Sequence, residues 1–444
     1  MKKINQEICS IAIPATIETL FTTMAGIIDS KMVSVLGLNA IAAISVTNQP
    51  KLFVLCFFFS INITISALVA KQRGRQDRER ANEITLAALG LVVLGAVVLG
   101  LLCVLLARPI MVICSNQPET MADSVLYFRV IMGGMMFNVV SMAINSAFRG
   151  CGNTKVTLIS NVVSCVVNIF CNYLFIEGHL GAPALGILGA AIATVAGTVA
   201  GMLISIVFAL QCKYYVNLPF CRKNRIRPSR SSFSEICVMW KRIFAEDIFT
   251  RIGFLVTGMI AARAGAFAMS VYSVSMHLLN INFAFGSGLS SAAIALVGKS
   301  YGAENKEEIQ LYSRQLLRFG TVISLLLGAV YIPCSGLYYS MFNSDPQFIK
   351  VGILSCLVIA ALSPIQNRQI IYNGIFRAVG DVKYTLRAAV VSVTLVNTVV
   401  SFVGTILLSL GIWGIWAGAF ANQTVRMLML HRRYRQTYRD GETP

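Results

Sequence analysis

The sequence NSAFRGCGNTK, at residues 145–155, returns in altered form as NGIFRAVGDVK at residues 373–383. Asn, Phe, Arg, Gly and Lys recur at identical positions, each 228 residues after its counterpart. The same ungapped register pairs residues from Glu18 with Glu246 through to Thr157 with Thr385. Matches at one fixed offset over that distance indicate a duplicated structural unit rather than a shared apolar composition.

The composition predicts a membrane protein. Of the 444 residues, 56% are hydrophobic and only 13% are charged, and the mean hydropathy is +0.71. Soluble domains carry about 25% charged residues. A membrane helix needs about 20 mainly apolar residues. On that rule the chain contains twelve spans, near residues 8–36, 44–70, 84–107, 124–147, 156–177, 185–210, 236–262, 267–297, 315–334, 351–376, 384–408 and 412–430.

The basic residues explain the net charge of +18 without a nucleic-acid partner. They gather in alternate loops and in the tail, whereas the intervening loops carry little beyond Arg108, Arg263 and Lys350. Such a bias marks cytoplasmic loops. It predicts a multi-pass protein of the plasma membrane with both termini in the cytoplasm.

The duplication and the spans together predict the architecture. We expect an all-α polytopic membrane protein with two six-helix lobes, related by a pseudo-two-fold axis along the membrane normal. Residues 1–211 form the N-lobe, 212–234 a basic cytoplasmic linker, 235–431 the C-lobe and 432–444 a cytoplasmic tail. The twelve cysteines contain no CxxC pair, and no nucleophile–base arrangement stands out. We therefore predict no enzyme activity, no cofactor and no metal site apart from an alkali cation.

Four polar residues at one depth predict an ion-coupling site in the N-lobe. Asp29 falls in the outer half of the first span, Asn168 and Asn172 lie one helical turn apart late in the fifth, and Thr194 lies early in the sixth. A membrane-embedded carboxylate is costly and usually functional. These oxygens suit Na⁺, and Asp29 alone would suit H⁺. The alternative is that the Asn and Thr side chains only hydrogen-bond across helices.

Two further carboxylates occupy equivalent places in the repeats. Glu18 and Glu246 lie at equal depth, nearer the cytoplasm than Asp29. They would border a cavity between the lobes and attract cationic substrates there. The alternative for each is a local ion pair.

Several stretches together resemble the multidrug and toxic compound extrusion (MATE) transporters over nearly the whole chain. They are IIDSKMVSVLGLNAIAA in the first span, the basic turns AKQRGRQ and GKSYGAEN, the duplicated pair above, and VNIFCNYLFI with GILGAAIAT. The resemblance implies antiport, in which an organic cation or drug leaves as H⁺ or Na⁺ enters.

The resemblance also carries residue roles. Asp29 matches the family's membrane-embedded aspartate, Asn168 its fifth-helix asparagine, and Thr194 falls in the sixth-helix pattern. Pro14 matches the proline at which the first helix is proposed to bend. The sequence departs at Asn172, where many prokaryotic members have Asp, so the site would carry one negative charge instead of two.

A related superfamily branch supplies the alternative function, a flippase for lipid-linked oligosaccharides. Such a protein should line its cavity with several basic residues for a pyrophosphate, and here the membrane-depth arginines are few. We therefore expect small-molecule organic cations or drugs and the lipid bilayer as the partners, and a monomer.

Overall fold

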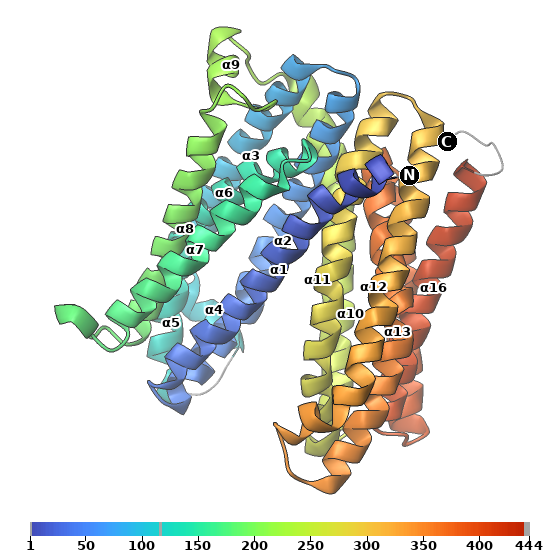
Figure 1. The fold of residues 1–444 in the computed structure, drawn as a ribbon. Helices are drawn as coiled ribbons and strands as arrows, with labels where there is room; N and C mark the ends of the chain where they lie inside the picture. Colours follow the sequence, from blue (N-terminus) through green and yellow to red (C-terminus); the bar gives the residue numbers. More distant parts are fainter. Residues whose placement is uncertain (1, 115–117, 439–444) are drawn as a thin grey trace. The chain divides into compact units, whose positions relative to one another are not determined.

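The computed structural model describes residues 2–114 and 118–438, and this part of the chain is helical without a strand (Figure 1). The predicted all-α architecture is therefore confirmed. The helices run in the order α1 (Lys2–Ser34), α2 (Leu38–Gly74), α3 (Arg78–Leu105), α4 (Ala107–Cys114), α5 (Pro118–Gly133), α6 (Met135–Gly150), α7 (Thr154–Phe175), the 3₁₀ turn η1 (His179–Gly181), α8 (Ile187–Ala209), α9 (Leu218–Lys223), α10 (Arg230–Arg263), α11 (Ala266–Gly302), α12 (Lys306–Ser340), α13 (Pro346–Val379), α14 (Val382–Ala389), the π-helical η2 (Val390–Asn397), α15 (Thr398–Phe402), the π-helical η3 (Val403–Leu407) and α16 (Ile412–Tyr438).

The helices account for the twelve predicted spans within the described residues. Nine are long and apolar enough to cross a membrane on their own, and α5 with α6 forms a tenth span that bends by 43°. The other two predicted spans coincide with α10 and α16, which contain more polar and charged residues and do not meet the same criterion of length and hydropathy. The predicted tail is in part a continuation of α16, which is helical as far as Tyr438, and Arg439 lies outside the described residues.

The chain divides into two compact units, and the first helix contributes to both. One unit is Ile17–Trp240, and the other combines Lys241 onward with the residues up to Thr16. The division therefore falls within α1, two residues after Pro14. The lobe boundaries predicted at residues 211 and 235 stay a prediction.

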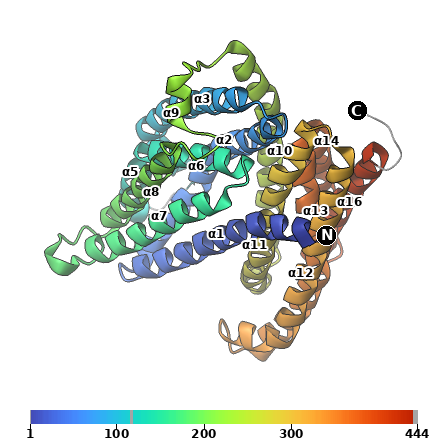
Figure 2. The same cartoon turned by 45° about the horizontal axis from the view of Figure 1, so that its top comes forward.

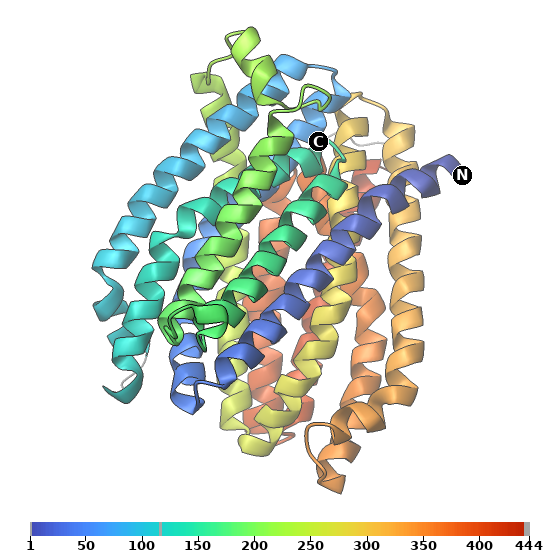
Figure 3. The same cartoon turned by 60° about the vertical axis from the view of Figure 1, so that its left-hand side comes forward.

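Small residues let the helices of the 17–240 unit approach closely. Gly189 of α8 faces the backbone of Phe175 in α7, where an added Cβ would lie 2.3 Å from the Phe175 oxygen. Gly197 of α8 faces Ser164 and Asn168 of α7 in the same way. Lipid tails are as apolar as the side chains that face them, so helices in a membrane associate mainly through close packing, which small residues allow. The two helices accordingly lie side by side (Figures 1 and 3).

The other unit is built around α11, α12 and α13, with α16 against α13 (Figure 2). The first residues of the chain complete its core, because Ile8, Ile11 and Ala12 are buried in one cluster with side chains of these helices. Thr16 touches Gly288 of α11 so closely that a Cβ at that glycine would clash with its hydroxyl.

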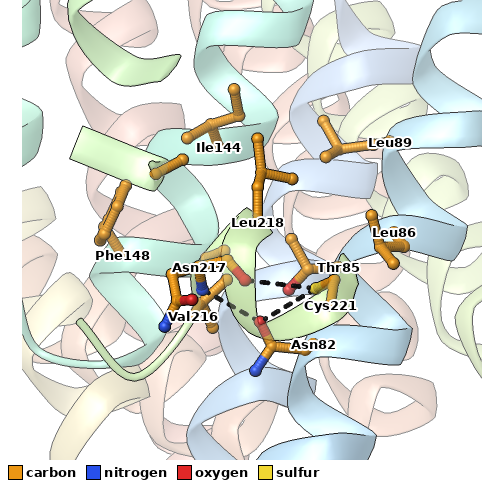
Figure 4. Close-up of a pocket in the computed structure, with 12 residues that line it drawn as sticks. Asn82, Thr85, Leu86, Leu89, Ile144, Phe148, Val216, Asn217, Leu218 and Cys221 are labelled. Atoms are coloured by element: carbon orange, nitrogen blue, oxygen red, sulfur yellow. Dashed lines mark hydrogen bonds between the residues drawn. The ribbon is translucent and has the colours of Figure 1, made fainter. Parts of the chain in front are cut away.

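The predicted linker is anchored to the 17–240 unit. Asn82 of α3 accepts hydrogen bonds from the Asn217 backbone N–H at 3.0 Å and from the Cys221 thiol at 3.4 Å. The Arg78 guanidinium donates to two linker carbonyls and lies 4.3 Å from the centre of the Phe220 ring. Figure 4 shows the small, largely apolar pocket beside these contacts, with Asn82, Asn217 and Cys221 among the residues that line it.

Candidate functional site

The predicted ion-coupling residues meet near the C-terminal ends of α1 and α7 in the 17–240 unit. Asp29 lies five residues before the end of α1, and Asn172 lies three before the end of α7. The Asn172 amide donates a hydrogen bond of 2.5 Å to the Asp29 carboxylate. Asn172 is completely buried, and its side-chain oxygen has no hydrogen-bond partner among the described residues. A buried acceptor without a donor is unusual and marks a place where a proton donor or a cation fits.

The other two predicted residues form the neighbouring contact. Asn168 lies one turn before Asn172 on α7 and donates to the Thr194 hydroxyl of α8 at 3.4 Å. The Thr194 hydroxyl also donates to the Ala190 carbonyl at 3.0 Å. The structure thus brings all four predicted side chains into two adjoining pairs. The role of these residues in ion coupling stays a prediction.

Two residues that the sequence analysis did not select belong to the same cluster. Tyr127 of α5 is buried close to both Thr194 and Asp29. It therefore lies next to both pairs. Lys51 of α2 also interacts electrostatically with Asp29. Its signal was present in the sequence, since it is a lone lysine inside an apolar span.

Glu18 is held by side chains from two other helices. Arg149, at the end of α6, lies 3.2 Å from its carboxylate. Thr157 and Asn161 of α7 donate to it at 2.6 Å each. The ion pair raised as the alternative for Glu18 is confirmed, and the carboxylate charge is locally compensated.

Glu246 repeats this arrangement in the other unit. Its carboxylate accepts from Arg377 of α13 at 3.1 Å and from Thr385 of α14 at 2.8 Å, the 228-residue counterparts of Arg149 and Thr157. Arg426 of α16 adds a third bond at 2.7 Å. We call these two networks the Glu18 clamp and the Glu246 clamp. The sequence analysis missed Arg426, although a charged residue in an apolar span was its signal.

The substrate role predicted for Glu18 and Glu246 stays a prediction, but the clamps alter its physical basis. Each carboxylate faces at least one guanidinium, so neither contributes a free negative charge. The predicted bend at Pro14 also stays a prediction, and α1 is helical on both sides of that residue.

Comparison with known proteins identifies the family. The MatE family model matches residues 14–174 and again residues 243–403, one match in each repeat. The chain belongs to the MatE family. The resemblance to MATE transporters noted in the sequence is thereby confirmed, and the protein is a multi-pass membrane protein of a transporter family.

Relatives of this MATE chain match over nearly its full length. The probable multidrug resistance protein NorM of Thermotoga maritima is 25% identical, covering 95% of this chain and 90% of that protein. The multidrug resistance protein MdtK of Photorhabdus laumondii is 20% identical, covering 98% and 96%. A solved structure described as the outward-facing conformation of a multidrug resistance MATE family transporter superposes with a TM-score of 0.90. It is 18% identical and covers 98% of this chain and 96% of its own. That likeness establishes the two-lobed fold.

Proposed function

We propose that this MATE protein is a secondary active transporter that exports small organic cations or drugs in exchange for H⁺ or Na⁺. The names of its relatives support drug efflux as the activity. The observation that carries the coupling is the membrane-embedded Asp29 carboxylate beside the unsatisfied oxygen of Asn172. Within the described residues no cationic group lies within 4.0 Å of Asp29 to form an ion pair.

The helix that carries Asp29 supplies a route for coupling. Residues before Ile17 belong to one compact unit, and Asp29 lies in the other. Binding of an ion at Asp29 changes the free energy of the conformations that α1 adopts. An ion that binds one conformation more tightly shifts the population toward it. The same linkage makes the substrate and the ion influence each other's affinity.

The remaining parts of the proposal concern its setting. We place the protein in the plasma membrane with both termini in the cytoplasm, because the basic loops alternate. It acts as a monomer, without a cofactor and without enzymatic chemistry. The flippase alternative has less support, because three arginines that a pyrophosphate would need, Arg149, Arg377 and Arg426, are engaged by glutamates.

Asp29→Asn tests the coupling. Purified protein in liposomes should export ethidium when a gradient of its coupling ion is imposed, so a pH gradient and a sodium gradient are applied separately. The variant should lose at least 90% of the gradient-driven rate. Thr257→Val is the matched control, because Thr257 occupies the Asp29 position in the second repeat and carries no charge. Normal gradient-driven efflux by Asp29→Asn would show that another group couples the ion.

A further inference from the structure

The linker, residues 212–234, carries a cluster of exposed basic side chains. It contains no Asp or Glu. Within the described residues, none of these side chains forms an ion pair with a carboxylate. We call the cluster the linker patch, and its members are Lys213, Arg222, Lys223, Arg225, Arg227 and Arg230. The positive charges of the linker patch therefore have no counter-charge in the part of the chain that the structure describes.

The arginines of the neighbouring turn between α2 and α3 are engaged in contrast. Arg73 and Arg78 donate to backbone carbonyls. Arg80 pairs with Glu83 at 2.9 Å and with Glu235 at 3.3 Å. Glu83 also accepts a hydrogen bond of 3.1 Å from the linker backbone. Because the two glutamates nearest the linker are bonded to Arg80, the charge of the linker patch stays available to an external partner.

The linker has a fixed fold, so the linker patch is displayed on an ordered segment. Asn217 begins α9 by accepting a hydrogen bond of 2.8 Å from the Phe220 N–H. α9 ends in a turn that the Ile226 N–H closes on the Cys221 carbonyl at 3.0 Å. In this turn Arg225 has φ of +48°, in the left-handed region that residues other than glycine seldom adopt. The basic side chains can therefore meet a ligand without the backbone having to fold first.

The linker begins where the lipid-facing surface of α8 ends. Leu203, Val207 and Leu210 are 53%, 52% and 53% exposed and share one face of α8. Lys213 follows three residues later, and Arg230 is the first residue of α10. In Figures 1 and 3, α9 lies at the same end of the 17–240 unit as the last turn of α8 and the start of α3. This position puts the linker patch at the level of the lipid headgroups, which favours a membrane surface over a soluble polyanion as its partner.

We propose that the linker patch binds the anionic headgroups of phospholipids in the cytoplasmic leaflet. Guanidinium and ammonium groups donate charge-assisted hydrogen bonds to phosphate oxygens. Each Lys or Arg close to an anionic bilayer strengthens association about fivefold, and salt screens the attraction. The binding holds the segment between the two repeats at the membrane surface. It does not depend on the transported substrate or on the coupling ion, so it goes beyond the function proposed above.

Native mass spectrometry of the full-length protein tests the proposal, because it counts the lipids that stay bound after release from detergent micelles. Equal amounts of phosphatidylglycerol and phosphatidylcholine are offered, and the ratio of the two bound lipids measures the preference for negative charge. The wild-type ratio should be at least about 10, and it should fall at least threefold, roughly, when ammonium acetate rises from about 0.05 to about 0.5 M. It should also fall at least about fivefold in the linker variant. That variant combines Lys213→Gln, Arg222→Gln, Lys223→Gln, Arg225→Gln, Arg227→Gln and Arg230→Gln.

A matched control variant removes the same charge from the other segments predicted to be cytoplasmic. Its ratio should stay within about twofold of the wild-type ratio, because the linker patch is intact. All of its positions are exposed, and it combines Lys155→Gln, Lys299→Gln, Lys306→Gln, Lys383→Gln, Arg432→Gln and Arg435→Gln. An equal fall in the linker and control variants would overturn the inference, since the preference would then follow the total charge of that face.

A wild type with no preference for phosphatidylglycerol would also overturn the inference. If such a protein instead bound a fluorescein-labelled RNA oligonucleotide through these residues, the surface would belong to a nucleic acid. Arg222→Gln with Lys223→Gln gives the same test with only two exposed changes, at the end of α9, should the six-residue variant fail to fold. The ratio should then fall about threefold or more, and an unchanged ratio would count against the linker patch.

Discussion

The Glu246 clamp should contribute more stability than the Glu18 clamp, and the paired variants Glu246→Gln and Glu18→Gln test this. The Glu246 side chain is 1% exposed, and its two arginines are 14% and 9% exposed. Removing its charge leaves two buried guanidinium groups with one poorly placed acid, Asp247, at 3.8 Å from Arg377. Removing one partner from a buried ion pair costs about 3–5 kcal/mol, because the remaining charge is left uncompensated.

The Glu18 clamp is more exposed, and its loss should cost less. The Glu18 side chain is 11% exposed and Arg149 is 28% exposed, so the guanidinium can turn toward water. Glutamine also keeps an acceptor for Thr157. We therefore expect a cost of about 1–2 kcal/mol for Glu18→Gln. At about 2–4 °C per kcal/mol for an unfolding unit of 150–250 residues, Glu246→Gln should lower the midpoint by about 6–20 °C. Glu18→Gln should lower it by roughly a third of that amount.

The assay is thermal unfolding of detergent-purified variants, followed by intrinsic fluorescence. Glu79→Gln and Glu307→Gln are the matched controls, because these acids are also repeat counterparts but are exposed. Each control should change stability by less than about 0.5 kcal/mol. Combining Glu246→Gln with Arg426→Gln should cost less than the sum of the two single variants, since both partners of one contact are then removed. Equal midpoints for the two clamp variants, or a larger loss for Glu18→Gln, would refute the argument from burial.

Two other predictions concern the 17–240 unit. Burial raises the pKa of the Cys151 thiol to about 12, so the thiol stays protonated and should resist maleimide at pH 7–9. The exposed Cys212 should react within minutes. Mass spectrometry of the labelled peptides measures both rates. Gly197→Ala should destabilise the protein by about 1–3 kcal/mol, because the new methyl group would lie 2.6 Å from the Ser164 carbonyl oxygen and 2.8 Å from the Asn168 Cβ. Gly26→Ala has open space around the new methyl group and should leave the stability unchanged. Equal unfolding midpoints for the two alanine variants would contradict the close approach of α7 and α8 at Gly197.

Hydropathy and duplication predicted the spans well because both are properties of the chain that lipid enforces directly. A helix that crosses the membrane must form its backbone hydrogen bonds internally and present apolar side chains to lipid. Each span can therefore be recognised from a short stretch of the sequence. The two least apolar spans, which became α10 and α16, were also predicted from the length of their mainly apolar segments. The candidate ion site was recovered in part for the same reason, since Asp29, Asn168, Asn172 and Thr194 stand out as polar groups at one depth.

The partners of the charged residues could not be predicted in the same way. Glu18 and Glu246 looked like free acids at the edge of a cavity, but arginines more than 130 positions away compensate them. The pairing depends on how each helix is rotated about its axis and how the helices pack. The sequence pattern indicates how deep a residue lies in the membrane but not which neighbouring helix its side chain faces. Lys51 was overlooked because a positive charge in an apolar stretch says nothing about which helix it faces.

The sequence by itself determined that this protein is an all-helical, duplicated membrane protein, because hydropathy and the repeat can both be recognised from the order of residues alone. Tertiary structure alone decided which charges neutralise one another and that α1 is divided between two compact units. It also decided that the side-chain oxygen of Asn172 finds no donor in the part of the chain that the structure describes. Those features arise from contacts between segments that are distant in the sequence. In the low dielectric constant of the interior, the presence or absence of a partner for a polar group changes the free energy strongly.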